Sequence, residues 1–158
     1  TPFKGFALHG LLTLQKPTYR KLDIEVAFSD GVTERANVSG NIVTAMSKVL
    51  IELDPSYNYK KWSVGLNFRY FGKQYINKTN TLYFNGHWET FGGVNWDVNK
   101  RLSLGCTVVN FLNQTGAKGS IAGAELITKE EAKDIKNCLM TGSYLRPFTV
   151  EFTANIRF

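Results

Sequence analysis

The feature that most constrains the fold is an apolar–polar alternation with a period of two residues, which returns throughout the chain. It is clearest in RPFTVEFTANIRF at 146–158, where Phe148, Phe152, Ile156 and Phe158 alternate with polar residues. Neighbouring side chains of a β-strand point to opposite faces of a sheet, so this pattern predicts a strand with one apolar and one polar face. We expect the apolar face of this last strand to lie against lipid.

The same alternation predicts six further strands and no long helix. The one helix-like segment, TKEEAKDIKN at 128–137, lies inside a long connection. The pattern therefore favours an all-β fold, an antiparallel meander of about seven strands. The expected strands lie near 4–15, 21–29, 47–57, 62–73, 82–98, 101–113 and 144–158.

The connections between these expected strands alternate in length. The short ones, KPTYRK, NYKK and NK, alternate with long ones at 30–46, 72–81 and 114–143. Alternate connections of a meander lie at the same end of the sheet, so one end should carry turns and the other long loops. Outer-membrane β-barrels have this asymmetry, with short periplasmic turns and longer extracellular loops. We therefore expect the three long loops to be extracellular.

Aromatic residues make up 13% of the chain and fall near both ends of the expected strands. Trp and Tyr favour the two interfaces of a membrane, so this placement predicts two aromatic girdles. The general abundance of aromatics in strands does not explain a two-ended placement. The girdle residues are Tyr57, Trp62 and Trp96 at the short-turn end, and Tyr70, Tyr83 and Tyr144 at the loop end.

Composition is compatible with such a barrel. The 158 residues contain no run of eighteen apolar residues, so no transmembrane helix is expected. The mean hydropathy of −0.19 does not argue against membrane strands, because lipid-facing and lumen-facing residues alternate and average out. The N-terminal TPFKGFALHG lacks the features of a signal peptide, which leaves a cytosolic protein, a mature chain or a fragment.

The net charge of +6 raises the question of nucleic-acid binding. The basic residues gather at the expected short turns, however, and do not form one face interleaved with aromatics, so no nucleic acid is expected. They form a rim that either meets anionic lipid headgroups of the inner leaflet or consists of ordinary solvated lysines. The rim comprises Lys16, Arg20, Lys21, Lys60, Lys61, Lys100 and Arg101.

No group of residues in the sequence has the spacing of a catalytic or metal site. His9 and His87 stand alone on polar or mixed strand faces and are best explained as lumen-facing hydrogen-bonding residues. Cys106 and Cys138 lack metal-binding spacing, and we interpret both as free thiols. The sequence therefore predicts no enzyme, cofactor or metal.

The segment VVNFLNQ at 108–114 resembles a motif near the end of the penultimate strand of TonB-dependent receptors. The family pattern is N-L-F-N/D; Asn110 and Asn113 match it, while Phe111 and Leu112 stand in swapped order. GAKGSIAGAELI at 116–127 and SYLRPFTVEFTANIRF at the end extend the likeness, as do GFALHGLLTLQKPTY, DPSYNYKKW and RYFGKQYINKTNTLYFNGHWETFGGVNW. Together they are similar to the C-terminal barrel portion of such receptors of the Bacteroidota type, across nearly the whole chain.

This resemblance implies a 22-stranded barrel in the outer membrane of a Gram-negative bacterium, filled by an N-terminal plug and energised by the TonB complex through an N-terminal part that this sequence lacks. Its partners would be outer-membrane lipid, a transported ligand of unknown identity and the barrel-assembly machinery. Phe158, with Ile156, Phe152 and Phe148, resembles the C-terminal signal that this machinery reads. Seven antiparallel strands leave two open edges, so the chain is expected to be a fragment, roughly the last third of a barrel.

Three functions are weighed. The first is part of the wall of a TonB-dependent active transporter for a scarce or bulky nutrient. The second is a passive porin or small standalone barrel, which would need an even number of strands and a signal peptide. The third is a soluble carbohydrate-binding β-domain. The alternation and the resemblance favour the first.

Overall fold

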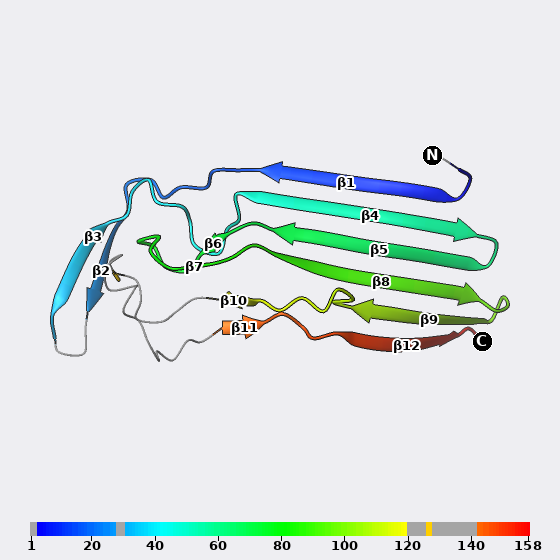
Figure 1. The fold of residues 1–158 in the computed structure, drawn as a ribbon. Helices are drawn as coiled ribbons and strands as arrows, with labels where there is room; N and C mark the ends of the chain where they lie inside the picture. Colours follow the sequence, from blue (N-terminus) through cyan, green and yellow to red (C-terminus); the bar gives the residue numbers. More distant parts are fainter. Residues whose placement is uncertain (1–2, 28–30, 120–125, 128–141) are drawn as a thin grey trace.

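The computed structural model describes residues 3–27, 31–119, 126–127 and 142–158, and these contain β-strands but no helix. In this part of the chain, no helix has the length and apolar character needed to cross a membrane. Six strands form one antiparallel sheet in the order β1-β4-β5-β8-β9-β12 (Figure 1). The expected all-β antiparallel fold is confirmed. The six are β1 (Phe6–Leu14), β4 (Val49–Tyr59), β5 (Trp62–Phe71), β8 (His87–Asp97), β9 (Leu102–Val109) and β12 (Thr149–Ile156).

Each long connection of this sheet contains a small two-stranded hairpin of its own. All three hairpins lie beyond the same end of the six-stranded sheet (Figure 1). They are β2 (Asp23–Ala27) with β3 (Thr33–Asn37), β6 (Gln74–Tyr75) with β7 (Tyr83–Phe84), and β10 (Ala117–Gly119) with β11 (Gly142–Tyr144).

The expectation that 21–29 forms a strand of the main sheet is wrong. Its strand, β2, pairs with the nearby β3, and β1 pairs directly with β4. A strand of five residues is too short for a membrane crossing, which needs about 9–11. The local partner is also close in sequence, so little loop entropy opposes the hairpin. The main sheet of the described residues thus has six strands rather than seven, and KPTYRK begins a long connection rather than a turn.

Three expected strands are shorter than their alternating patterns. The segment 82–98 is interrupted at Gly86, where a Cβ atom would lie 2.5 Å from the Tyr70 hydroxyl oxygen and 2.9 Å from a backbone carbonyl oxygen. The segment 101–113 leaves the sheet at Asn110, whose φ of 53° is incompatible with an extended strand. The segment 144–158 is divided between β11 and β12.

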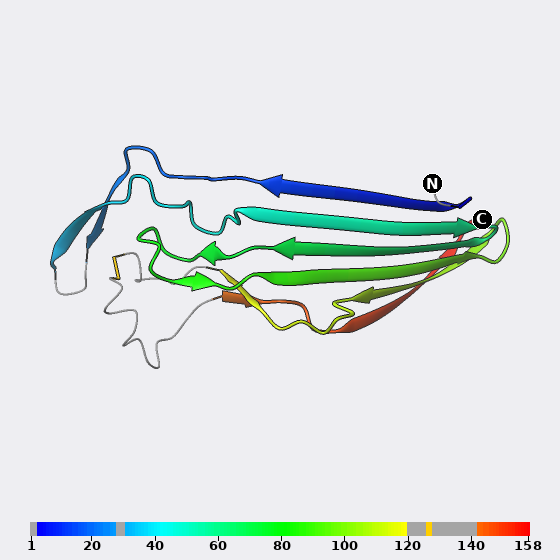
Figure 2. The same ribbon diagram turned by 45° about the horizontal axis from the view of Figure 1, so that its top comes forward.

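The two ends of the sheet differ strongly. Connections β4–β5 and β8–β9 are tight turns at 60–61 and 98–101, while β1–β4, β5–β8 and β9–β12 are joined by long segments at the other end (Figure 1). Figure 2 shows that the sheet is curved. It is also open, since β1 and β12 each have a strand neighbour on one side only. In hydrocarbon such edges would leave backbone groups without partners.

This topology shows that the seven basic residues of the expected rim do not all lie at the same end of the sheet. Lys60, Lys61, Lys100 and Arg101 lie in or beside the two tight turns. The other three basic residues follow β1, whose last residue pairs with the first residue of β4 at the opposite end of the sheet. Lys16, Arg20 and Lys21 therefore belong to the loop end.

Candidate functional surfaces

One face of the six-stranded sheet is apolar from edge to edge. Residues directly opposite each other in neighbouring strands share a face. The register places the even positions of β1, β5, β8, β9 and β12 and the odd positions of β4 together. The face includes Leu8, Leu12, Ile51, Leu53, Val64, Leu66, Phe68, Val94, Leu104, Val108, Val150, Phe152 and Ile156.

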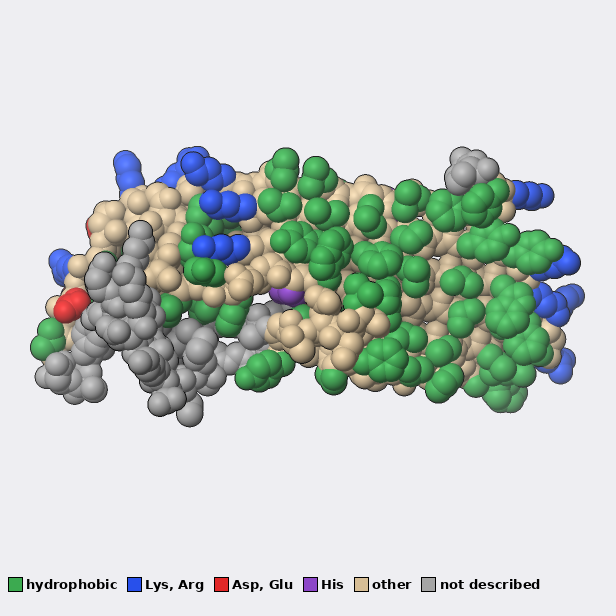
Figure 3. All heavy atoms as spheres, in the orientation of Figure 1, with side chains coloured by type: hydrophobic (Ala, Val, Ile, Leu, Met, Phe, Trp, Pro, Cys, Tyr) green, Lys and Arg blue, Asp and Glu red, His purple; other side chains and the backbone are tan. Residues whose placement is uncertain are grey.

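The apolar face is exposed in the described part of the chain. Leu14 retains 70% of its accessible surface, Phe152 81% and Ile156 62%. Figure 3 shows hydrophobic side chains gathered on this face from the tight-turn end of the sheet toward the loops. A soluble protein rarely leaves so wide an apolar patch uncovered, so this face is suited to contact hydrocarbon.

Aromatic pairs cross this face at both ends. Trp62 and Trp96 are direct neighbours with ring centroids 5.3 Å apart, and Tyr70 and Trp88 are direct neighbours at 5.1 Å. The two pairs are eight residues apart on each strand, which at about 3.3 Å per residue is roughly 26 Å. For a strand tilted by about 40°, this spacing covers roughly 20 Å of membrane thickness, against an apolar band about 25 Å tall.

The other expected girdle residues lie in different parts of the structure, one near the turn end of the sheet and two in the hairpins beyond its loop end. Tyr57 lies near the turn end and stacks on Tyr59, with 6.4 Å between the centroids. Tyr83 and Tyr144 belong to β7 and β11, in the hairpins beyond the sheet. They therefore do not share a row with Tyr70. A girdle role stays a prediction for all six residues.

The opposite face carries polar and charged residues in register. Glu52, Arg69 and Glu89 are direct neighbours across β4, β5 and β8, and Arg69 Nε lies 3.7 Å from a Glu52 carboxylate oxygen. Side chains that alternate in charge across a sheet stabilise the pairing. This face is polar enough to line an aqueous lumen or to contact a polar plug.

His9 belongs to a three-residue group on the polar face. Its Nδ1 atom lies 3.1 Å from Asp54 Oδ2, and the Asn67 amide donates a hydrogen bond to the other Asp54 oxygen. His87 lies on the same face, with Nε2 3.6 Å from Glu89 Oε1. Both histidines thus have polar neighbours, and a lumen-facing position stays a prediction for each. No set of three metal-binding side chains converges among the described residues.

The Asn110 motif is a tight turn that follows β9. Asn110 and Asn113 have positive φ angles of 53° and 48°, and Asn113 N donates to Asn110 O over 2.8 Å. Asn tolerates this backbone region better than most residues. The buried Asn110 amide also donates to Arg146 O at 3.0 Å and to Gln114 O at 2.9 Å, while its oxygen accepts from Gln114 N. One side chain thus joins both sides of a long loop.

The rest of the turn packs onto the apolar face. The ring of Phe111 meets that of Phe68 edge-on at 5.4 Å, and Leu112 N donates to the hydroxyl of Thr90. Thr90 is fully buried although it stands on the apolar face. The turn therefore covers the one polar side chain that β8 places on the apolar face.

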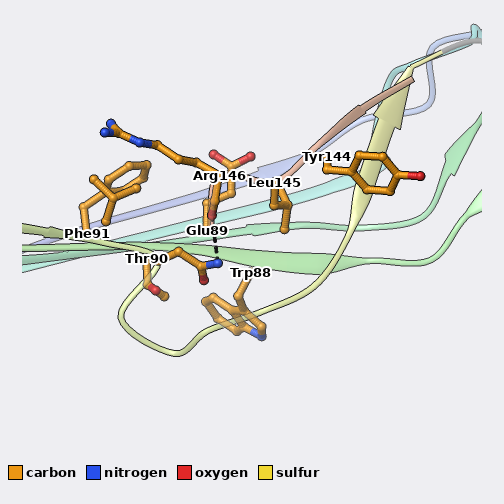
Figure 4. Close-up of a pocket in the computed structure, with 9 residues that line it drawn as sticks. Trp88, Glu89, Thr90, Phe91, Tyr144, Leu145 and Arg146 are labelled. Atoms are coloured by element: carbon orange, nitrogen blue, oxygen red, sulfur yellow. Dashed lines mark hydrogen bonds between the residues drawn. The ribbon is translucent and has the colours of Figure 1, made fainter. Parts of the chain in front are cut away.

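A hollow of about 330 Å³ lies beside this turn. Glu89 and Phe91 point to one side of β8 and Trp88 and Thr90 to the other, so its lining includes residues of both faces (Figure 4). Leu145 and Arg146 of the returning chain lie above β8 in that view, while Tyr144 points away to the right. Its mixed lining gives no clear site for a ligand.

The second long connection contains a buried asparagine that the sequence did not reveal. Asn77 has no exposed surface; its amide donates to the hydroxyls of Thr79 and Thr81, and its oxygen accepts from the backbone of Thr81 and Leu82. A second asparagine, Asn80, bonds both backbone groups of Ile42. The bonds between Asn80 and Ile42 join the first long connection to the second, and no local sequence pattern indicates this pairing. The partners of Asn77 lie within its own loop.

The remaining sequence expectations fall in different places. Cys106 is a free thiol on β9, and Cys138 lies outside the described residues, as does the helix-like segment 128–137. Ile156, Phe152 and Phe148 are exposed on the apolar side of the last segment, and Phe158 is exposed at its end. Their role in barrel assembly stays a prediction.

No family model matches the chain, and no curated protein matches it in sequence. Solved structures do match in fold. A siderophore receptor of Acinetobacter baumannii, PiuA, aligns with a TM-score of 0.74 at 14% identity, over 96% of this chain and 19% of that one. Fiu, the ferric-catecholate import receptor of E. coli K12, aligns in its closed form with a TM-score of 0.64 at 19% identity, over 99% and 19%. FpvA of P. aeruginosa, bound to a heterologous pyoverdine, aligns at 0.59 and 16%, over 96% and 17%.

These alignments show the fold of the chain as that of a barrel wall. The resemblance to TonB-dependent receptors is confirmed at that level. The chain spans about a fifth of the length of the structures it matches. The Bacteroidota type stays a prediction.

Proposed function

We propose that this chain forms part of the wall of an outer-membrane receptor that imports a scarce or bulky nutrient by TonB-dependent active transport. The observation that carries the proposal is the continuous exposed apolar face on one side of a curved six-stranded sheet. The strands of the sheet have eight to eleven residues, which is close to the length of about 9–11 residues that a membrane crossing needs. The likeness in fold to siderophore and ferric-catecholate receptors supports the transport class.

The open edges of the sheet support a larger barrel. Completing the hydrogen bonds of β1 and β12 in hydrocarbon requires further strands on both sides. We propose that the complete protein supplies them, together with the part that contacts the TonB complex. The polar face that includes Arg69 and Glu52 would then line the lumen.

A soluble carbohydrate-binding domain is less compatible with this structure. Such a domain would cover its apolar face with a second layer, whereas many large apolar side chains on this face are exposed among the described residues. Transport proteins, rather than enzymes, are the fold neighbours, and we propose no catalysis.

Two measurements test the proposal in the bacterium that makes the protein. The complete protein should fractionate with the outer membrane and migrate faster in unheated than in heated gel samples. Because ferric chelates are bound or imported by several fold neighbours, a ferric siderophore panel is the first substrate set. Uptake of one member should be lost on deleting the protein and on deleting TonB. Uptake that persists without TonB would indicate a passive channel instead.

A further inference from the structure

A hollow of about 300 Å³ lies where β4 begins and β5 ends. Val49 and Tyr70 contribute to its wall, and both stand on the apolar face. Tyr70 also belongs to the aromatic pair at the loop end. The hollow is therefore at the boundary between the apolar band and the polar loops.

Two lysines line this hollow. Lys48 precedes β4, and Lys73 follows β5; both are exposed. Figure 3 shows Lys and Arg side chains on the apolar face just beyond the loop end of the hydrophobic band. None of the residues that line the hollow is acidic, and no described carboxylate forms an ion pair with either lysine. The positive charge of this site is thus not neutralised by its described neighbours.

The Lys73 ammonium is held in place by two aromatic rings. Its Nζ atom lies 3.4 Å from the ring centroid of Tyr83 and 4.8 Å from that of Tyr75, and these rings meet edge-on. Cation–π contacts of this kind restrain a flexible side chain. The backbone around the hollow is also fixed, since the buried Ser47 hydroxyl donates to Gly72 O over 2.9 Å.

We propose that Lys48 and Lys73 bind the phosphate group of an outer-leaflet membrane lipid whose acyl chains lie along the apolar face of β1 and β4. The site rests on the proposed function, because it requires this face to lie in a membrane with the loops outside. Lysine is a common point-charge partner for phosphate. Leu14 lies directly opposite Val49 and Leu12 opposite Ile51, so an apolar surface continues from the hollow along both strands.

The position of the two lysines beside an apolar surface favours a lipid over a dissolved anion as the ligand of this site. A free anion would need no adjoining apolar surface, whereas a lipid needs a charged site joined to one. The hollow meets the second description, since its wall includes Val49 and Tyr70. Basic residues close to an anionic membrane surface are each expected to strengthen its binding.

The test uses the complete protein, purified in mild detergent and freed of bound lipid. Its affinity is measured by native mass spectrometry for a phosphorylated outer-membrane glycolipid and for the same lipid with its phosphates removed. We expect the double variant Lys48→Gln, Lys73→Gln to bind the phosphorylated lipid roughly thirtyfold more weakly, which corresponds to about 1 kcal/mol for each lysine. The paired Lys→Arg variant should bind within about threefold of the parent, since it keeps both charges.

The matched control is Lys60→Gln, Lys61→Gln, which removes two lysines at the turn end and should leave the affinity unchanged. Equal binding of the phosphorylated and dephosphorylated lipids would overturn the site, as would an unchanged affinity in the Lys48, Lys73 variant. Displacement of the lipid by millimolar inorganic phosphate would indicate a free-anion site instead. Heat-modifiable migration is recorded for every variant: a parent that lacks it contradicts the proposed function, whereas folded variants with unchanged lipid binding contradict only the lipid site.

Discussion

The Asn110 side chain should hold the two sides of the third long loop against the barrel wall. Replacing it by alanine removes three hydrogen bonds of 2.8–3.0 Å, two to Gln114 and one to Arg146. Each such bond contributes about 0.5–1.5 kcal/mol net. Alanine at a φ of 53° costs about 1–2 kcal/mol more. Because these terms are not fully additive, we expect a local destabilisation of about 3–5 kcal/mol.

The perturbation is local, so global unfolding of a large barrel is a poor assay for it. Hydrogen exchange of the complete protein, followed by mass spectrometry, resolves peptides that cover 108–116 and 144–149. Exchange of the amides held by Asn110 should become at least about a hundredfold faster in Asn110→Ala, since each 1.4 kcal/mol is a factor of ten. Peptides from the β4–β5 turn at 60–61 should be unchanged.

Two further variants separate the causes. Asn110→Gly removes the same hydrogen bonds but accepts the positive φ, so it should be less damaging than Asn110→Ala. Asn113→Ala keeps the backbone bond of the turn and changes an exposed residue, so only the conformational cost of about 1–2 kcal/mol remains. If Asn110→Ala exchanged no faster than Asn113→Ala, the side-chain bonds would not be what anchors this loop.

Three other predictions concern the two faces of the sheet, its two ends and the second long loop. In the complete protein, Phe152→Arg should destabilise the folded barrel by about 2–4 kcal/mol if the residue is near mid-membrane, while Thr153→Arg on the polar face should be tolerated. Denaturant titration in lipid vesicles compares the unfolding free energies of the two variants. Equal losses would contradict the assignment of Phe152 to the lipid-facing side and Thr153 to the lumen-facing side. A cysteine at Glu34 should react with a membrane-impermeant maleimide on intact cells and one at Lys60 should not; the reverse labelling would invert the orientation. Asn77→Ala should accelerate proteolysis of the second long loop at least tenfold, because buried loop backbone groups lose their partner; an unchanged cleavage rate would mean that other contacts hold the loop.

The wall strands could be predicted from the sequence because a strand keeps its period of two wherever one face meets hydrocarbon. Trp62 and Val64 show it in β5, and their register partners Trp96 and Val94 continue it in β8. The prediction failed at 21–29, where five alternating residues belong to a hairpin outside the sheet. Alternation reports two unlike faces, and such faces also occur in a loop hairpin. Length is the property that separates the two cases.

The polar sites were harder to predict because they depend on contacts between distant segments. Asn110 stood out as part of a motif, but its bond to Arg146 joins residues 36 positions apart. Asn80 looked like one polar loop residue among many until the first and second connections were seen together. Lys48 and Lys73 meet only because β4 and β5 are paired. Spatial pairing, rather than composition, defines all three sites.

The central claim is that one face of this sheet meets lipid and the other an aqueous lumen. It is tested most directly by placing a nitroxide spin label at each position of β4 and β5 in the complete, membrane-reconstituted protein. Collision rates with oxygen, which concentrates in hydrocarbon, and with a water-soluble nickel complex are measured by electron paramagnetic resonance. The account predicts oxygen maxima at the even positions of 62–71 and the odd positions of 49–59, with nickel maxima at the alternate positions. A profile without a two-residue period, or one with the opposite phase, would contradict it.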